Sequence, residues 1–278
     1  MSKLIIVSNR LPVTVSRDED EIKYTESIGG LATGLKKCHQ KAGSLWVGWP
    51  GIADDEINAE EKAGIESNLK EYKCSPVFLT QMEIDRYYFG FSNDTIWPLF
   101  HYFTTKVNYD AKTWESYKNV NEIFCEKVNS VIEEGDTVWI HDYQLMLLPE
   151  LVRKAHPNCK IGFFLHIPFP SYEIFRLLPQ RNELLEGLLG ADLVGFHTYD
   201  YVRHFLSSVR RIRGYENEFN VVDHEDNLVK VDVFPMGIDY DFFSGDLDDS
   251  QISEEVKESL SKDDKLKTIL SVDRLDYS

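Results

Sequence analysis

Residues 163–170, which read FFLHIPFP, decide the fold of this chain. Residues 160–165 are apolar on both faces, as expected of a parallel strand that helices cover on both sides. Strand pairing must end at Pro168, because proline has no N–H to donate to a ladder. His166 therefore lies at the carboxyl end of a buried strand, where open α/β sheets bind ligands. From this segment alone, a functional histidine and a core histidine that hydrogen-bonds a backbone carbonyl are equally good interpretations.

The alternation of strand and helix recurs along the chain. Short apolar runs predict further strands at residues 4–8, 45–49, 76–79, 137–140 and 192–196. Helical spacing predicts helices at residues 111–132, 144–155, 181–189 and 201–213, and another that opens at Gly29-Gly30 after a flexible loop. Repeated β–α units predict an α/β fold with a doubly wound, mainly parallel sheet.

Composition excludes several classes of partner. The chain has 278 residues and a net charge of −17, so its surface as a whole repels nucleic acid and anionic membrane. No apolar run approaches the length of a membrane span, and no signal peptide precedes the first strand. The four cysteines form no CxxC pair, which leaves zinc and redox motifs unsupported. We therefore expect a cytoplasmic protein with free thiols and no metal.

The character of the sequence changes after Gly237. Residues 246–262 are acidic with a helical pattern, and residues 266–272 start a fresh strand with only six residues to follow. A new strand needs a sheet to pair with. We therefore expect a first domain over residues 1–245 and the truncated start of a second α/β domain over residues 246–278. A dangling edge strand on the first sheet is the alternative.

Two features near the N-terminus are candidates for phosphate binding. Arg10 follows the first strand. An arginine at a strand end can donate two parallel hydrogen bonds to phosphate oxygens, although surface arginines are common. Gly29 and Gly30 stand just before a helix, where glycine lets the backbone approach a phosphate and the helix N-terminus supplies N–H groups. Turn chemistry alone would also explain this glycine pair, which is not a GxGxxG motif.

Other strand ends carry polar residues as well. Asp142 follows the strand at residues 137–140, where its carboxylate can accept hydrogen bonds from sugar hydroxyls, act as a base, or merely cap the next helix. Arg274 follows the last strand. Because Asp142 and His166 lie on strands consecutive in the chain, they are expected to face one crevice.

Aromatic side chains crowd two neighbouring segments. Residues 87–93 read YYFGFSN and residues 97–102 read WPLFHY. Aromatic side chains in such segments can stack on a sugar ring, although most of them are expected in the core. The Ser92-Asn93 pair is expected to cap the helix that follows.

Together these residues resemble the trehalose-6-phosphate synthases, the retaining GT-B glucosyltransferases of family 20. The resemblance rests on short motifs in order along the whole chain: SNRLP at 8–12, GGL at 29–31, WVGWPG at 46–51, FSN at 91–93, WIHDYQL at 139–145, FFLHIPFP at 163–170, DLVGFH at 192–197, PMGI at 235–238 and DRLDYS at 273–278. It implies two facing Rossmann-like domains, of which the second is only begun here. It also implies transfer of glucose from UDP-glucose to glucose 6-phosphate, with retention and without metal or cofactor.

The resemblance also implies roles for individual residues. Arg10, Tyr88, Trp97 and Asp142 would bind glucose 6-phosphate, Gly29 and Gly30 would close over the donor phosphates, and His166 and Arg274 would contact the donor glucose and the diphosphate. His166, Asp142 and Arg274 would form the catalytic set. In such enzymes the leaving phosphate can take the acceptor proton, so His166 is expected to position the sugar rather than act as a general base.

Three further expectations come from the resemblance. The family's diphosphate-binding lysine follows the DRLDYS motif and lies beyond residue 278, so the chain alone is expected not to turn over. The donor site is accordingly expected to be essentially absent from this chain, and micromolar binding of UDP-glucose by the chain alone would refute that expectation. A non-catalytic regulatory or scaffold domain is the alternative function, and a glycogen synthase or sugar epimerase is a more distant one. A homo-oligomer, a trehalose-phosphatase partner or a fused phosphatase domain would fit the family.

Overall fold

The computed structural model describes residues 2–19, 21–27, 30–225 and 227–238, together with residues 240, 253 and 271. The chain divides into two compact units, Met1–Met236 and Gly237–Ser278. The boundary expected at residue 245 and the strand expected at residues 266–272 lie outside the described residues, so the second domain stays a prediction. All elements named below belong to the first unit.

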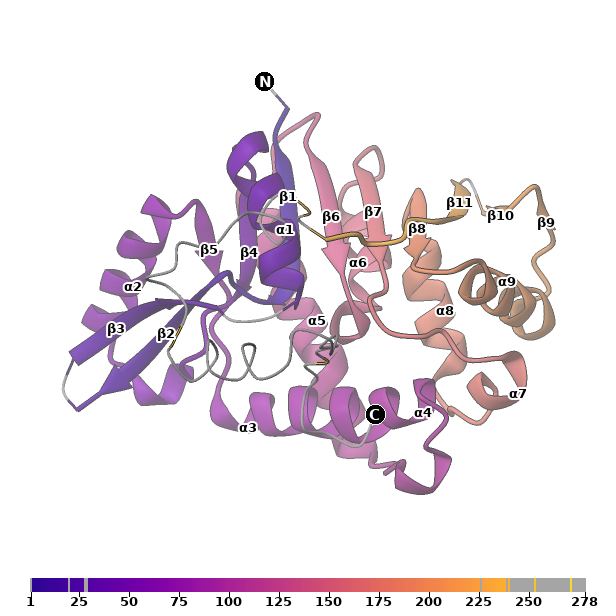
Figure 1. The fold of residues 1–278 in the computed structure, drawn as a ribbon, viewed down its shortest axis with the longest axis horizontal. Coiled ribbons are helices and arrows are strands. Elements are labelled where there is room, and N and C mark those ends of the chain that lie inside the picture. The colour runs from indigo at the N-terminus through magenta and orange to yellow at the C-terminus, as the bar shows by residue number, and fades with distance from the viewer. Residues whose placement is uncertain are drawn as a thin grey trace, which may run out of the picture. The chain divides into compact units, whose positions relative to one another are not determined.

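A sheet of nine strands within the described residues forms the centre of the first unit (Figure 1). Its strands, in spatial order, are β5 (Cys74–Pro76), β4 (Leu45–Trp49), β1 (Leu4–Arg10), β6 (Thr137–His141), β7 (Lys160–Phe164), β8 (Leu193–Phe196), β11 (Asn227–Val233), β10 (Val221–His224) and β9 (Asn217–Glu218). Strands β5 to β11 in this order run parallel, and β10 and β9 are antiparallel additions at one edge. The expected mainly parallel sheet is confirmed.

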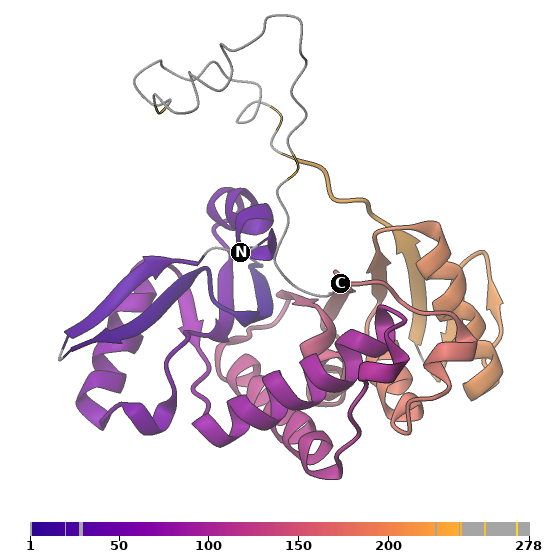
Figure 2. The ribbon, with the colours of Figure 1, turned by 60° about the horizontal axis from the view of Figure 1, so that its bottom comes forward.

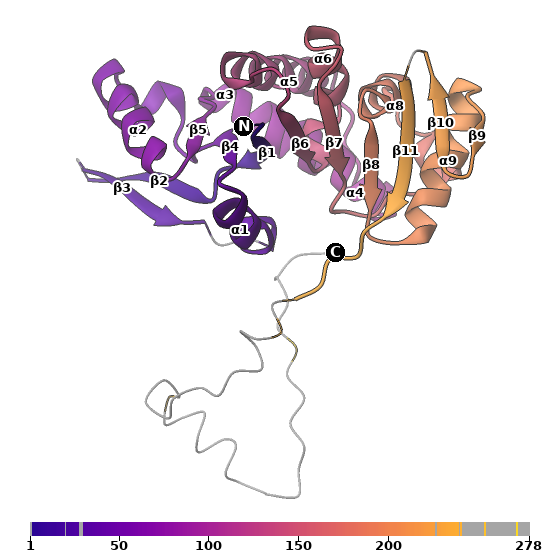
Figure 3. The same ribbon diagram turned by 90° about the horizontal axis from the view of Figure 1, so that it is seen from above.

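Both faces of the sheet are covered. On β1 the side chains of Ile5 and Val7 belong to one hydrophobic cluster and that of Ile6 to another, because successive residues of a strand point to opposite faces. Helix α1 (Gly30–Ala42) and the hairpin of β2 (Val13–Asp18) and β3 (Glu21–Glu26) lie on one side of the sheet. Helices α5 (Ala111–Val131) and α6 (Leu148–Ala155) lie on the other side (Figure 3). This is the doubly wound arrangement.

The remaining helices connect the strands. They are α2 (Ala59–Glu71), α3 (Gln81–Glu83), α4 (Trp97–Phe100), α5 (Ala111–Val131), α6 (Leu148–Ala155), α7 (Tyr172–Phe175), α8 (Arg181–Leu189) and α9 (Tyr199–Arg213), with short 3₁₀ turns η1 (Asp54–Glu56), η3 (Thr104–Lys106) and η4 (Tyr143–Leu145). Helix α5 buries Trp114, Tyr117 and Phe124 along one stripe, as its helical spacing predicts. In the described part of the chain, no helix is both long and apolar enough to cross a bilayer.

A π-helix, η2 (Ile84–Ile96), runs directly into α4. Figure 2 shows this helical run in magenta, beside helix α5. The expectation that Ser92 and Asn93 cap a following helix is wrong, because both residues lie inside η2 and no helix begins after them before Trp97. The wider π turn changes which side chains share a face, and π-helical turns are frequent at functional sites.

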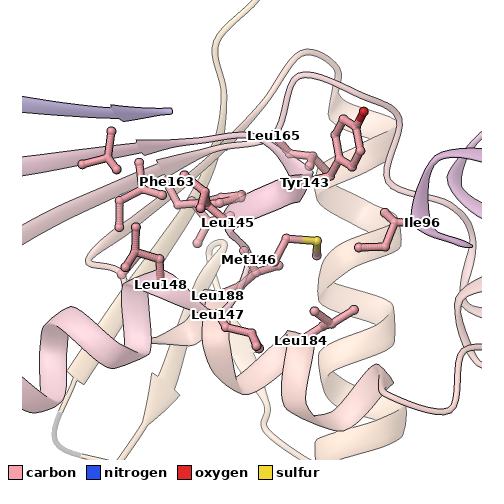
Figure 4. Packing of buried hydrophobic residues seen from close by; sticks show 14 of the residues in the cluster. Ile96, Tyr143, Leu145, Met146, Leu147, Leu148, Phe163, Leu165, Leu184 and Leu188 are labelled. Atoms are coloured by element: carbon pink, nitrogen blue, oxygen red, sulfur yellow. The ribbon is translucent and has the colours of Figure 1, made fainter. Parts of the chain in front are cut away.

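A buried cluster packs below the ends of β6 and β7. Leu145, Met146 and Leu148 meet Phe163 and residues of α8 such as Leu184 and Leu188 (Figure 4). Tyr143 lies at the margin of this cluster, with its hydroxyl pointing away from Met146 (Figure 4). The chain segment that follows β6 is therefore anchored in the core by its own side chains.

Most predicted elements shift by one or two residues at an end, whereas two elements differ more from the structure. The strand expected at residues 76–79 is β5 (Cys74–Pro76), since the Leu79 carbonyl already accepts a hydrogen bond from Asp54 N at 2.8 Å, away from β4. The helix expected at residues 144–155 is divided into η4 and α6, because Pro149 lies in the first turn of α6 and starts a new helix there.

Candidate functional site

The polar residues at the strand ends gather at one edge of the sheet. Strands β1, β4, β6, β7 and β8 are parallel neighbours, so their carboxyl ends meet at this edge. Arg10 ends β1, His141 ends β6, and His166 and His197 follow β7 and β8. We call this set of strand ends, with Asp142, the carboxyl edge.

Arg10 lies at the carboxyl edge against an aromatic ring. Its guanidinium carbon lies 4.4 Å from the centre of the Trp49 ring. Burial lowers the pKa of Arg10, and an electrostatic interaction with Tyr88 opposes this shift. Among the described residues no carboxylate forms an ion pair with Arg10. A half-buried, unpaired guanidinium is a favourable partner for a phosphate.

Gly51 makes room for the Arg10 side chain. The backbone of Gly51 has a φ of 111°, which glycine adopts far more readily than other residues. A Cβ atom at this position would lie 2.9 Å from a terminal nitrogen of Arg10 and 3.2 Å from Cγ2 of Thr14. The loop after β4 therefore fixes the guanidinium from one side while Trp49 covers its face.

Helix η2 crosses the ends of β1 and β6. The Tyr87 hydroxyl donates to Asn9 Oδ1 at 3.1 Å, next to Arg10. At the other end of η2, the Tyr143 hydroxyl donates to Asn93 Oδ1 at 2.8 Å. The Tyr143 ring also lies 5.5 Å from the Trp97 ring, measured between centroids. These contacts place the aromatic segment beside the carboxyl edge, as its predicted role in sugar binding requires.

Asp142 uses one carboxylate oxygen for the fold. Its Oδ1 accepts the main-chain N–H groups of Tyr143 at 3.0 Å and His166 at 3.1 Å. Its backbone has a φ of 76°, so the chain turns sharply where β6 ends. Burial raises the pKa of Asp142 to about 7, although the two N–H donors oppose this shift. Oδ2 has no hydrogen-bond partner among the described residues, which leaves it for a ligand hydroxyl.

Three histidines stand in a row along the carboxyl edge. His141 Nδ1 and His166 Nε2 are 3.0 Å apart and share a hydrogen bond. The His166 and His197 rings lie 5.7 Å apart between centroids. Burial lowers the pKa of His166 to about 3, with a smaller contribution from His197, and burial also lowers the pKa values of His141 and His197. His166 is therefore neutral at physiological pH, and its partner is a side chain rather than a backbone carbonyl.

The predicted site residues divide into two groups. Arg10, Tyr88, Trp97, Asp142 and His166 lie at or beside the carboxyl edge. Gly30 begins α1, and a Cβ atom there would meet nothing within 4 Å, so the described structure does not require glycine at this position. The predicted residues Gly29 and Arg274 lie outside the described residues. Within the described ranges, no group of three or more His, Cys, Asp or Glu side chains could hold a metal ion.

Comparison with known proteins identifies the family. The model of glycosyltransferase family 20 matches residues 2–278. The chain belongs to glycosyltransferase family 20. A relative of this family 20 chain, the UDP-forming alpha,alpha-trehalose-phosphate synthase of Emericella nidulans, is 44% identical over an alignment of 282 positions that covers 99% of this chain and 55% of the relative. The chain spans about half the length of the curated relatives it matches.

Two solved structures share the fold of this family 20 chain. A UDP-forming synthase from Burkholderia xenovorans in complex with glucose-6-phosphate matches with a TM-score of 0.71 and 28% identity, over 87% of this chain and 51% of that chain. The N-terminal domain of the Candida albicans trehalose-6-phosphate phosphatase matches with a TM-score of 0.76 and 31% identity, over 94% of this chain and 54% of that chain. The GT-B type of fold is thereby confirmed.

Several further residues at the carboxyl edge of this family 20 chain are recognised only in the structure. His197 follows a buried strand just as His166 does, so the same reasoning could have selected it. Trp49 and Gly51 stand in the WVGWPG motif, but only the structure shows that they surround Arg10. The pairing of His141 with His166 depends on the register of β6 and β7, in which His141 lies opposite Phe164.

Proposed function

We propose that the protein to which this chain belongs transfers glucose from UDP-glucose to glucose 6-phosphate, with retention, giving α,α-trehalose 6-phosphate and UDP. One observation carries the proposal: the unpaired Arg10 guanidinium stands one strand away from Asp142, whose Oδ2 has no partner among the described residues. A cation beside a hydroxyl acceptor suits a sugar phosphate. The names of the relatives support the same reaction.

The acceptor would lie across the ends of β1 and β6. Arg10 would bind its phosphate, Asp142 Oδ2 would accept hydrogen bonds from its hydroxyls, and Tyr88 and Trp97 would contact the sugar. Adjacent strands are about 4.8 Å apart, so these groups can reach one small molecule. Binding of an acceptor hydroxyl favours the ionised carboxylate, which would lower the raised pKa of Asp142.

The donor glucose would lie near His166. A neutral imidazole whose pKa is about 3 is a poor general base at neutral pH, which supports a positioning role. The acceptor would then attack on the face that the diphosphate leaves, and the leaving phosphate would take the acceptor proton. Catalysis would come from positioning and from electrostatic stabilisation of the leaving group. Gly29, Gly30 and Arg274 are proposed for the donor phosphates through the resemblance alone.

The acceptor distinguishes this function from others. The full-length protein would be supplied with UDP-glucose and either glucose 6-phosphate or a glycogen primer, and the UDP released would be measured. We expect UDP and trehalose 6-phosphate with glucose 6-phosphate and no turnover with the primer. UDP release that depends on the primer would refute the proposal.

A non-catalytic role in a trehalose-synthesising complex is the second candidate. It is favoured by one observation, the equally good match to the N-terminal domain of a protein named as a phosphatase. Such a domain is expected to lose the phosphate-binding arginine or the motif carboxylate, whereas this chain retains Arg10, Asp142 and His166. The presence of these side chains supports the enzyme, and the assay above decides between the two.

The location in the cell and the partner proteins are also proposals. We propose a cytoplasmic protein, which is supported by the free thiols of all four cysteines, each of which lies in the described part of the chain. A homo-oligomer, a trehalose-phosphatase partner or a fused phosphatase domain remains a prediction, in line with a Kluyveromyces lactis relative named as a 56 kDa subunit.

A further inference from the structure

His141 is a buried titratable residue that the proposed reaction does not use. It ends strand β6 and has no exposed surface. Its Nδ1 lies 3.0 Å from Nε2 of His166, and its buried Nε2 has no hydrogen-bond partner among the residues that the structure describes. A buried histidine with one satisfied and one unsatisfied nitrogen restricts where the protons of the pair can be.

Two arrangements of protons are compatible with the hydrogen bond. In the first, His141 Nδ1–H donates to His166 Nε2, so the proton of His166 is on Nδ1 and His141 Nε2 is bare. In the second, His166 Nε2–H donates to His141 Nδ1, so the proton of His141 is on its buried Nε2. Both rings are neutral, because His141 is fully buried, His166 is partly buried, and the two imidazoles are in contact.

The second arrangement leaves a buried N–H donor without an acceptor. Buried donors without partners are rarer in proteins than acceptors with unused lone pairs, because each donor has lost its hydrogen bond to water. Aromatic rings line this part of the edge: Trp139 lies 4.4 Å from His141 and Phe164 lies 4.6 Å from His166, between centroids. These rings offer no oxygen acceptor to His141 Nε2, so the first arrangement is favoured.

We propose that His141 is a positioning residue that fixes His166 in the tautomer with its proton on Nδ1. His166 then has an N–H donor that no described side chain uses, available for an oxygen of the sugar that binds at the carboxyl edge. The identity of that sugar rests on the proposed function, whereas the tautomer does not. The arrangement also explains why a residue without access to solvent or ligand is a histidine rather than an apolar residue.

The tautomer can be observed directly without substrate. In the full-length protein with ¹⁵N-labelled histidine, long-range nitrogen–proton correlation spectra distinguish protonated from bare ring nitrogens. Loss of peaks in His166→Gln assigns His166. We expect a protonated Nδ1 and a bare Nε2 for His166 in the wild type. A protonated Nε2 on His166 would overturn the proposal, and this holds even if no variant of His141 folds.

Two substitutions distinguish a role of His141 in positioning His166 from a role in packing alone. In His141→Asn the amide nitrogen takes the place of Nδ1–H, so His166 should keep its tautomer and most of the activity. In His141→Leu the donor is lost, so His166 should populate both tautomers and kcat/KM should fall about tenfold or more, the equivalent of one hydrogen bond. His156→Asn, on an exposed histidine bonded to Asn129, is the control and should change neither readout.

The outcomes separate this inference from the proposed function. An unchanged His166 tautomer in folded His141→Leu would contradict the positioning role. The expected tautomers in a protein that transfers no glucose would refute the proposed function and leave the role of His141 intact.

Discussion

Asp142 Oδ1 accepts the main-chain N–H of His166 at 3.1 Å, so one carboxylate oxygen ties the end of β6 to the segment after β7. The same oxygen caps the turn that begins at Tyr143. The two interpretations of Asp142, as a cap and as a ligand for sugar hydroxyls, are therefore compatible, because each needs a different oxygen. The same carboxylate that shapes the carboxyl edge is available to bind at it.

The raised pKa of Asp142 predicts a pH-dependent stability. Burial raises this pKa from 3.8 to about 7, so the native state holds its proton where the unfolded chain has lost it. The contribution is therefore fully present below about pH 4 and is lost as the pH rises through 7. Relative to Asp142→Asn, wild-type protein should lose at most about 3 kcal/mol of unfolding free energy between pH 5 and pH 8. Urea unfolding at the two pH values measures this.

The control for this prediction is Asp85→Asn. Asp85 is exposed, and its carboxylate accepts a hydrogen bond from Gln81 on the same helical run. Its substitution should change the unfolding free energy equally at both pH values. A difference between wild type and Asp142→Asn that stays constant with pH would show that the Asp142 carboxyl is not held protonated by burial.

Tyr117→Phe should destabilise the segment that carries Asp142. The buried Tyr117 hydroxyl donates to the Tyr143 carbonyl at 2.7 Å and accepts from Met146 N at 3.1 Å. Its removal leaves two buried main-chain groups without partners, so the unfolding free energy should fall by about 1–3 kcal/mol. Chemical denaturation measures the loss, with the exposed Tyr109→Phe as control. Equal effects of the two substitutions would contradict the structural role of the Tyr117 hydroxyl.

Gly51→Ala should weaken acceptor binding through Arg10. The added Cβ would lie 2.9 Å from a terminal nitrogen of the guanidinium, which must move. We expect KM for glucose 6-phosphate to rise about tenfold, the equivalent of one hydrogen bond to a charged group, with a smaller change in kcat. Steady-state kinetics with varied glucose 6-phosphate tests this.

Gly135→Ala controls for backbone strain in that experiment. Gly135 also has a positive φ, 87°, but a Cβ there would meet nothing within 4 Å. Both substitutions should cost stability through strain of the backbone. Only Gly51→Ala should raise KM, and a similar rise in Gly135→Ala would mean that strain rather than displacement of Arg10 explains the effect.

Strand ends could be predicted from the sequence because they depend on local rules. The strand at Leu45–Trp49 and the helix at Arg181–Leu189 have the predicted bounds, since apolar runs and helical spacing mark them directly. His166 was selected in the same way, because proline stops strand pairing wherever it stands. The parallel sheet then placed it beside Asp142 without further information.

Elements that depend on tertiary contacts could not be predicted. The hairpin of β2 and β3 was expected as a flexible loop, because no Asn-Gly or Gly-Gly turn marks it; instead Glu19 adopts a φ of 52°. The π-helix η2 fits no 3.6-residue template, and contacts such as Tyr87 with Asn9 hold it in place. The pairing of His141 with His166 likewise depends on the register of β6 and β7, which cannot be read from the sequence.

The central claim is that the carboxyl edge binds the phosphate of glucose 6-phosphate through Arg10. Isothermal titration of the full-length protein with glucose 6-phosphate and with glucose tests it, in the wild type, in Arg10→Ala and in the control Arg17→Ala, whose side chain pairs with Glu61. Arg10→Ala should weaken binding of glucose 6-phosphate about 10- to 100-fold and leave binding of glucose unchanged. Equal affinity of wild type and Arg10→Ala for glucose 6-phosphate would contradict the account.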